Sequence, residues 1–591
     1  MAAPVDVAAL TAALRALPTG DADGDALQRL GRRARRAVAA GDLGQPVRIR
    51  IVSSFMIDML ADALAASLLR RGIVAELDLA PYGALPTGLI GQTSQPDCDV
   101  LMLLPTHRDV MHTPDLQADR DAAARAADQE ADFWAGLWPS DRPVVQLTFD
   151  PPAFRAAAEA DGFTPGGTLS HVRAVNQRLA ERAGSHVALV DAEALAAQVG
   201  RDWHSARTYA LCKQPFANDA MTEVSEALAA AVAGVTGRGR KVLVLDLDNT
   251  LWGGVIGDVG LEGLVLGMET AEGEAFVALQ RYAQALSRRG VILAVCSKNN
   301  DAIARSAFGG HSGMVLQVDD IACFMANFED KATNIRRIAA TLNVGLDSLV
   351  FVDDNPVERE WVKSQLPEVL VIDLPEDPAG YVEAIEKARP FPLHRLTAED
   401  VGRNRSYLAR AKVAEAAGAA GDIDAFLAGL EPRATCAPLA PENADRVVQL
   451  IGKTNQFKLN PTTWPAEALR ADGVGVLALS LADRMQDYGI VAVAVTRAAG
   501  DDLIVEQWVM SCRVFSRRLE HAMLERLARS AVENGCRRIV LPFEPSAKNG
   551  VARDFLTALG FVEADGGRLV IDVDTPAAAP HHMTLTDWRR P

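Results

Sequence analysis

Short apolar segments alternate with longer Ala-rich segments through much of this 591-residue chain. Apolar runs of about four to eight residues are typical of buried strands, whereas the Ala-rich segments have the length and periodicity of helices. Strands that alternate with helices form parallel sheets with helices on both faces. The predicted strands are 47–55, 73–80, 100–106, 144–149 and 186–192 in one region, and 242–246, 291–297, 348–354 and 369–375 in a second.

The pattern changes after residue 390, and the chain divides into several domains. At ~100–200 residues per domain, its length allows about three to five of them. The Gly- and Arg-rich segment 237–241 separates the two α/β regions, and the last region mixes strands with one long predicted helix at 518–535. We predict a helical segment (1–46), an α/β domain (47–236), a second α/β domain (240–390), a helical linker (391–430), an α+β domain (431–575) and a tail (576–591).

Composition and charge argue against several classes of protein. The 60 Lys and Arg residues face 77 Asp and Glu residues, and the net charge of −17 repels nucleic acid and anionic membranes. The seven cysteines form no CxxC pair, which argues against a disulfide framework or a zinc knuckle and fits a reducing compartment. The N-terminus has early acidic residues and no unbroken apolar run. We therefore expect a cytoplasmic protein with no signal peptide, membrane span or nucleic-acid partner.

Acidic pairs follow two predicted strands of the second α/β domain. Asp246 and Asp248 end the first strand, and Asp353 and Asp354 end another. Alternate residues of an extended segment project to the same side, so Asp246 and Asp248 can converge on one point. The carboxyl ends of parallel strands are also where α/β sheets bind ligands. The sequence therefore predicts an acidic site at this edge of the sheet.

This set of side chains suits phosphoryl transfer. We assign Asp246 as the nucleophile that attacks phosphorus to give an aspartyl phosphate, and Asp248 as the general acid and base. Ser297 would donate a hydrogen bond to the phosphoryl oxygens, and Lys331 would balance the charge of the transition state. Phosphate and carboxylates are all anionic, so we expect Mg²⁺ as cofactor. The candidate ligands are Asp246, Asp248, Asp353 and Asp354.

The order of these motifs resembles the haloacid dehalogenase superfamily, and the segments LDLDNTLWGGVIGDVG, CSKNN and FVDDNPVERE are similar to its FkbH-like subfamily, subfamily IIIC. The resemblance implies a Rossmann-like core and an enzyme that takes a glyceryl group from 1,3-bisphosphoglycerate and removes phosphate. It further implies that the acyl group is loaded on an acyl carrier protein in polyketide or related secondary-metabolite biosynthesis. The matching motifs also imply that Asn249, Thr250 and Asn299 contact the substrate.

The spacing of the motifs leaves no room for a cap domain over this site. The stretch from Thr250 to Ser297 holds little more than a loop and one or two helices, and the stretch from Lys331 to Asp353 is shorter still. We therefore predict a capless core whose open site admits a group carried on a protein, with neighbouring domains serving as the lid.

The C-terminal domain resembles the GNAT acyltransferase fold, in which backbone N–H groups at a helix start hold the pyrophosphate of coenzyme A. The segments KTNQF, VMSCRVFSRRLEHAML and PSAKNGVARDFLTALGF continue the similarity to FkbH-like proteins. The phosphate loop of that fold reads RxxGxG, but 513–518 has Ser and Arg in place of the glycines, which would crowd a pyrophosphate. Cys512 is a candidate thioester nucleophile. The candidate carrier-binding or base residues are Arg513, Arg517, Arg518, His521 and Asn549.

The α/β domain at 47–236 is similar to SGNH hydrolases at one position. Ser53 and Ser54 directly follow the first strand, where that family has its nucleophile. The nearest Asp/His pair is Asp202 and His204, with DxH spacing where the family has DxxH. We therefore expect an SGNH- or flavodoxin-like fold that serves as a docking or capping element.

Several functions remain open from the sequence. The leading hypothesis combines Mg²⁺-dependent dephosphorylation at Asp246 with acyl transfer through Cys512 to the phosphopantetheine thiol of a carrier protein. The alternatives are a plain phosphatase acting on a small phosphate ester, a non-catalytic carrier-protein scaffold, and an acetyltransferase that uses acetyl-CoA. The intact acidic set argues against the scaffold, and the missing glycines argue against the acetyltransferase.

Overall fold

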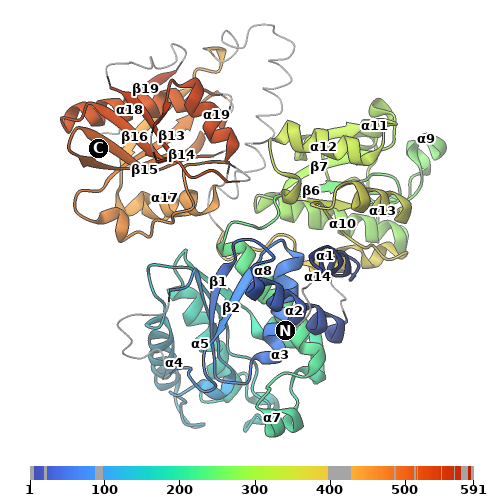
Figure 1. Ribbon diagram of the computed structural model, residues 1–591. Coiled ribbons are helices and arrows are strands. Elements are labelled where there is room, and N and C mark those ends of the chain that lie inside the picture. Colours follow the sequence, from blue (N-terminus) through green and yellow to red (C-terminus); the bar gives the residue numbers. More distant parts are fainter. Residues whose placement is uncertain are drawn as a thin grey trace. The chain divides into compact units, whose positions relative to one another are not determined.

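The computed structural model describes residues 6–18, 23–86, 97–396, 407, 428–454, 456–484, 487–511, 514–515, 517–546, 549–564, 566–573 and 583–587. Residues 1–239 and 385–395 form one compact unit, and residues 240–384 and 396–591 form another (Figure 1). In the described residues the first unit contains one sheet and the second contains two. Two of these sheets are wholly parallel, which confirms the predicted α/β class.

The N-terminal unit is built on a five-stranded parallel sheet. Its elements are α1 (Val7–Arg15), α2 (Gly24–Ala40), β1 (Val47–Ser53), α3 (Asp58–Arg70), β2 (Ala75–Leu79), β3 (Val100–Leu104), η1 (His107–Asp109), α4 (Arg120–Ala135), β4 (Val144–Leu147), η2 (Ala158–Ala160), α5 (Thr168–Arg182), β5 (Val187–Val190), α6 (Ala192–Val199), η3 (Gly200–Trp203), α7 (Ala206–Cys212) and α8 (Asn218–Val235). The strand order β2-β1-β3-β4-β5 is the flavodoxin-like order. Apolar residues of α3, α6 and α8 fill one core and those of α4 and α5 fill the other, so helices cover both faces.

The second parallel sheet carries the predicted acidic site. Its elements are β6 (Val242–Leu245), α9 (Ile256–Val259), η4 (Leu261–Gly263), α10 (Ala271–Arg288), β7 (Ile292–Ser297), α11 (Asp301–Gly310), η5 (Val318–Asp320), β8 (Ile321–Ala326), α12 (Lys331–Leu342), η6 (Leu346–Ser348), β9 (Leu349–Val352), α13 (Pro356–Gln365), β10 (Leu370–Val371), η7 (Pro378–Gly380) and α14 (Tyr381–Ala388). The strand order is β10-β9-β6-β7-β8. Only α9, η4 and α10 join β6 to β7, and only α12 and η6 join β8 to β9, so neither connection holds an inserted domain and the predicted capless core is confirmed.

The C-terminal sheet is mixed, as predicted for an α+β domain. Its elements are β11 (Arg433–Pro438), α17 (Pro441–Lys453), β12 (Phe457–Lys458), η8 (Ala468–Arg470), β13 (Gly475–Ala482), β14 (Asp487–Ala499), β15 (Asp502–Met510), α18 (Leu519–Glu533), β16 (Arg538–Pro542), α19 (Gly550–Ala558), β17 (Val562–Ala564), β18 (Arg568–Asp572) and β19 (Thr584–Asp587). β15 and β16 pair in parallel over only three residues each, and β12 pairs with the far end of β15. β19 comes from the predicted tail, where its backbone pairs with β11 and completes an edge of the sheet.

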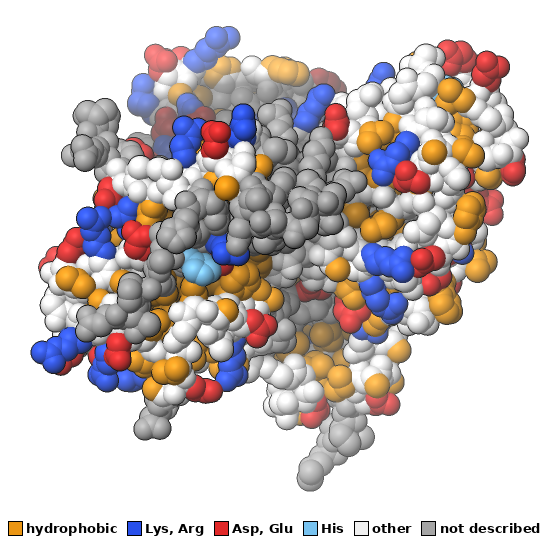
Figure 2. Space-filling model, turned by 90° about the horizontal axis from the view of Figure 1, so that it is seen from above, with side chains coloured by type: hydrophobic (Ala, Val, Ile, Leu, Met, Phe, Trp, Pro, Cys, Tyr) orange, Lys and Arg blue, Asp and Glu red, His pale blue; other side chains and the backbone are white. Residues whose placement is uncertain are grey.

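The predicted linker at 391–430 falls largely outside the described residues. Among the helices of the described ranges, none combines the length and apolar character needed to cross a bilayer. Figure 2 shows Lys and Arg interspersed with Asp and Glu on one face of the molecule. The expectation that the chain binds neither nucleic acid nor membrane stays a prediction.

Candidate active site

The acidic pairs lie at the point where the strand order of the second sheet reverses. β6 is the first strand of this sheet in the chain and β9 the fourth, yet they are neighbours, with Leu245 paired to Val352. The N–H of Asp246 donates to the carbonyl of Val352 at 3.0 Å, and Asp353 and Asp354 follow directly. Crevices at the carboxyl ends of strands that flank such a reversal bind ligands in open α/β sheets.

Lys331 connects the two acidic strand ends. It is the first residue of α12, where the side chain of Asp330 caps the helix by accepting from the N–H of Thr333 at 3.0 Å. Its buried Nζ lies 2.9 Å from Oδ2 of Asp246 and also donates to Oδ2 of Asp353. Burial alone would lower the pKa of Lys331, but the two carboxylates outweigh it and hold that pKa above its ordinary value.

Three carboxylates surround this single ammonium group. Asp246, Asp353 and Asp354 can each offer one oxygen within 4.8 Å of the others. Burial, together with the charge of Asp246, raises the pKa of Asp353 and of Asp354. Oδ1 of Asp246 is buried and has no hydrogen-bond partner among the described residues. Three neighbouring carboxylates with one ammonium group leave an excess of negative charge and of oxygen ligands, which fits a hard divalent cation such as Mg²⁺.

Asp248 lies outside this group of three. Its Oδ1 accepts from Trp252 Nε1 at 2.9 Å and from the N–H of Ile256 at 3.1 Å, and its Oδ2 accepts from Asn299 Nδ2 at 2.9 Å. Burial raises the pKa of Asp248. The carboxylate that was expected to ligate Mg²⁺ is therefore held by three donors, which lower its pKa, but burial outweighs them and keeps the pKa above its ordinary value.

The other predicted residues near this edge are engaged within the loops. Thr250 Oγ1 accepts from the N–H of Asp354 at 3.1 Å, and Asn249, at φ +55°, accepts from the N–H of Gly254 at 2.8 Å. These contacts shape the loops. That Asn249 and Thr250 contact the substrate stays a prediction. Ser297 is buried at the carboxyl end of the neighbouring strand β7.

Three residues near the site were not predicted from the sequence. Trp252 donates a hydrogen bond to Asp248. Because it lies four residues further along the same motif, the sequence could have indicated this contact. Arg359 donates to the backbone carbonyls of Asp353 and Asp354 at 2.7 Å each, and Tyr381 donates to the carbonyl of Asn249 at 3.3 Å. Tyr381 is far from Asn249 in the sequence, so no local sequence pattern predicts this contact.

Arg517 in the C-terminal domain was expected to meet a carrier or a phosphate, and the structure differs. The side chain is buried, with Nη2 lying 2.8 Å from Tyr488 Oη and 3.2 Å from Oδ2 of the buried Asp483. A buried cation takes an internal partner because desolvation is otherwise costly. Arg518 is the left-handed N-cap of α18, at φ +58°.

Asn549 is also committed to internal contacts. It is buried, and its Nδ2 donates to the carbonyls of Lys458 and Glu544 at 3.1 and 2.9 Å. These contacts give Asn549 a structural role, and its predicted role in carrier binding stays a prediction. His521 is only partly exposed, with Nδ1 3.4 Å from Oε1 of the buried Glu520. The predicted Cys512 and Arg513 lie outside the described residues.

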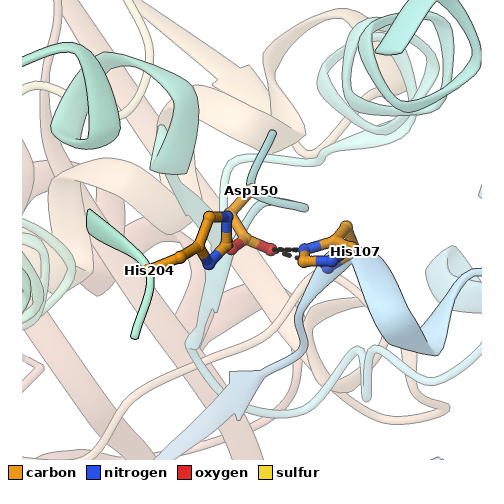
Figure 3. A group of neighbouring side chains, drawn as sticks. All are labelled: His107, Asp150 and His204. Carbon is orange, nitrogen blue, oxygen red and sulfur yellow. Dashed lines mark hydrogen bonds and ion pairs between the residues drawn. The ribbon is translucent and has the colours of Figure 1, made fainter. Parts of the chain in front are cut away.

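The predicted residues of the N-terminal domain do not form a triad. Ser54 Oγ donates to Oδ2 of Asp109 at 2.6 Å, and Asp202 is exposed. The nearest carboxylate to His204 is that of Asp150, which follows β4 (Figure 3). Asp202 is close to His204 in the sequence, but its side chain is exposed to solvent and does not pair with His204.

The fold and the acidic edge define an α/β protein with a cluster of carboxylates at the carboxyl edge of a parallel sheet. The chain is similar to the N-terminal part of the protein BF1531 from Bacteroides fragilis, described as containing a phosphatase domain complexed with Mg. The two are 29% identical with a TM-score of 0.56, and the match covers 62% of this chain and 99% of the other. No family model and no curated protein matches the chain.

Two acetyltransferase structures match shorter parts of the chain. The ribosomal-protein-S18-alanine N-acetyltransferase of Escherichia coli is 16% identical, with a TM-score of 0.19 and coverage of 24% of this chain and 94% of the other. The GNAT domain of S. lividans PAT is 21% identical, with a TM-score of 0.19 and coverage of 23% and 89%. These scores are too low to support an argument, and the class of the C-terminal domain rests on its own strand order.

Proposed function

We propose that this chain is an FkbH-like, Mg²⁺-dependent enzyme of the haloacid dehalogenase type. In this proposal it removes phosphate from a phosphorylated glyceryl donor such as 1,3-bisphosphoglycerate and delivers the acyl group to the thiol of an acyl carrier protein. The observation that carries the proposal is Lys331 between Asp246 and Asp353, with Oδ1 of Asp246 buried and unpaired. The similarity to the Bacteroides phosphatase domain supports its first half.

In this proposal each side chain of the site has a task in the chemical step. Lys331 holds Oδ2 of Asp246, which leaves Oδ1 to attack phosphorus. As the new O–P bond forms, the bond to the leaving oxygen breaks and Asp248 gives its proton to that oxygen. Water then attacks the aspartyl phosphate, loses a proton to Asp248 and releases phosphate. The phosphate removed in this way would be the ester phosphate of the donor, because attack on the phosphorus of the carboxyl phosphate would release an unactivated carboxylate. The carboxyl phosphate would instead leave as inorganic phosphate when a thiol attacks the acyl carbon and forms the thioester. Ser297, at the same sheet edge, would donate to a phosphoryl oxygen.

Asp246, Asp353 and Asp354 are the residues that would hold Mg²⁺. When bound, the ion would neutralise the approaching phosphate and the excess of carboxylates. Arg359 donates to the backbone carbonyls of Asp353 and Asp354 and so fixes the loop that carries these two carboxylates.

The absence of a cap supports a large substrate. Between β6 and β7 the chain forms only α9, η4 and α10, and none of these adds a strand to the sheet. An open edge suits a donor or acceptor attached to a carrier protein, which a covered site would exclude.

A plain phosphatase acting on a small phosphate ester is the second candidate. The observation that favours it is that Arg517 and Asn549, two of the residues expected to bind a carrier, form hydrogen bonds within the C-terminal domain. In that case the C-terminal domain would contribute nothing to turnover, and a Cys512→Ser variant would keep full activity.

Intact-protein mass spectrometry distinguishes the two functions. The enzyme is incubated with Mg²⁺ and enzymatically generated 1,3-bisphosphoglycerate, as wild type, Asp246→Asn and Cys512→Ala. We expect a glyceryl adduct on wild type that is absent from Cys512→Ala and moves to added holo carrier protein. Phosphate release without an adduct on any variant would leave the plain phosphatase, and no phosphate release at all would overturn both.

A further inference from the structure

His107, Asp150 and His204 converge at the carboxyl edge of the N-terminal sheet (Figure 3), whereas the acidic site belongs to the other unit of the chain. His107 follows β3, Asp150 follows β4, and His204 follows η3. Each offers one nitrogen or oxygen within 4.8 Å of the others. Nδ1 of His107 lies 2.9 Å from Oδ1 of Asp150, and Nε2 of His204 lies 3.6 Å from Oδ2.

Asp150 is the buried centre of this cluster, with 1% of its side chain exposed. Among the described residues, the polar side chains that contact its carboxylate are His107, Trp203 and His204, and none of them is Lys or Arg. A buried carboxylate of this kind requires a compensating positive charge.

We propose that His107, Asp150 and His204 bind one divalent transition-metal ion, with Zn²⁺ as the best-fitting class. Two imidazoles and one carboxylate are the ligand set that Zn²⁺ accepts, whereas Mg²⁺ prefers the all-oxygen set around Asp246. The same three protein ligands leave a fourth position open, and the side chains of His107 and His204 are 11% and 23% exposed. The site would therefore admit water or a ligand donor.

Surrounding donors already fix the carboxylate in place. The N–H of His107 donates to Oδ1 of Asp150 at 2.7 Å, and Trp203 Nε1 donates to Oδ2 at 3.1 Å. Such outer donors orient a metal-binding carboxylate and tune its affinity. Without metal, Nε2 of His204 lies 2.9 Å from the carbonyl of Pro151. Metal binding at Nε2 would displace this hydrogen bond, and the ring proton would then lie on Nδ1.

Cobalt titration of the full-length, metal-stripped chain tests the proposal, with excess Mg²⁺ present to occupy the acidic site. We expect one equivalent of Co²⁺ to bind with the visible absorption of nitrogen ligation and to be displaced by Zn²⁺. His107→Ala and His204→Ala should each lower the affinity for Zn²⁺ by more than about 100-fold, and Trp203→Phe by roughly 10-fold.

His112→Ala is the matched control for these variants. His112 also pairs with a buried carboxylate, Glu130, at 2.7 Å, but lies outside the cluster, so its loss should leave metal affinity unchanged. His107→Gln and His204→Gln, checked by thermal melting, replace the alanine variants if those fail to fold.

Three results would overturn the proposal. These are no stoichiometric binding by wild type, binding with a thiolate signature, or equal affinity in the wild type and in the two folded histidine variants. The cluster would then be a hydrogen-bonded His107–Asp150 pair without metal. The test does not depend on phosphatase activity, so its outcome is independent of the proposed function.

Discussion

Nζ of Lys331 lies 2.9 Å from Oδ2 of Asp246, with both side chains buried. This contact occupies one oxygen of the carboxylate and leaves the other without a partner. A catalytic carboxylate needs one oxygen free for phosphorus or a cation, and this arrangement provides it without leaving the buried charge uncompensated.

Replacement of Lys331 with Met should destabilise the protein as well as inactivate it. The change leaves Asp246 and Asp353 buried without their cation, which costs about 3–5 kcal/mol. Urea unfolding measures the loss. Added Mg²⁺ should restore part of the stability but not the activity. Unchanged stability would mean that Lys331 does not compensate these carboxylates.

Asp246→Asn should lower phosphate release by about 10⁴-fold or more, as expected when a nucleophile is removed. The exposed Asp258→Asn, in the same domain, is the control and should keep wild-type activity. Phosphate release is measured with saturating Mg²⁺. An Asp246→Asn variant with more than a tenth of wild-type activity would move the nucleophile elsewhere.

Mg²⁺ should stabilise the protein more at pH 8 than at pH 5. The raised pKa of Asp353 and Asp354 means that the folded state binds more protons than the unfolded state. Stability without metal therefore falls as the pH rises from about 4 toward neutrality, and Mg²⁺ removes this penalty. At 100 times its Kd, Mg²⁺ should contribute about 2.7 kcal/mol at pH 8.

Thermal shift measurements at the two pH values check this prediction. Asp354→Asn is the matched variant, because it removes one candidate ligand and one excess charge. It should be more stable than wild type without metal at pH 8 and respond less to Mg²⁺. A larger shift at pH 5 than at pH 8 would contradict the assignment.

Trp252→Phe should alter the pH profile of turnover. Its Nε1 donates to Asp248, and a donor to a carboxylate lowers its pKa. Without it the pKa of Asp248 rises further, so the general acid stays protonated to higher pH and the alkaline limb of kcat moves upward. The less firmly held acid should also lower kcat by about 10- to 100-fold. An unchanged limb would exclude Asp248 as the acid.

Arg517→Met should destabilise the C-terminal domain and leave phosphate release unaffected. The change removes the buried cation that pairs with Asp483, at a cost of about 3–5 kcal/mol. Arg484→Met is the exposed control and should change stability by less than about 0.5 kcal/mol. If the Arg517→Met variant instead kept wild-type stability and lost only the transfer to the carrier protein, Arg517 would be a carrier-binding residue.

The acidic site could be anticipated because each of its parts is local. Asp246 and Asp353 directly follow unbroken apolar strands, and such strands end at one edge of a parallel sheet. β8 was not predicted from IACFMA, and β11, β12, β17, β18 and β19 have weak sequence patterns of their own. Pairing with longer neighbours, which no local segment records, stabilises them.

The sequence by itself determined the α/β class, the capless core and the set of acidic residues, because strand periodicity and motif spacing are local properties of the chain. Only the tertiary structure decided that Asp248 turns to Trp252 and Asn299, that Arg517 is buried against Asp483, and that Asp150 joins His107 and His204. These pairings depend on the strand order and on burial. A charged side chain removed from water takes whatever partner the fold brings within reach, regardless of separation along the chain.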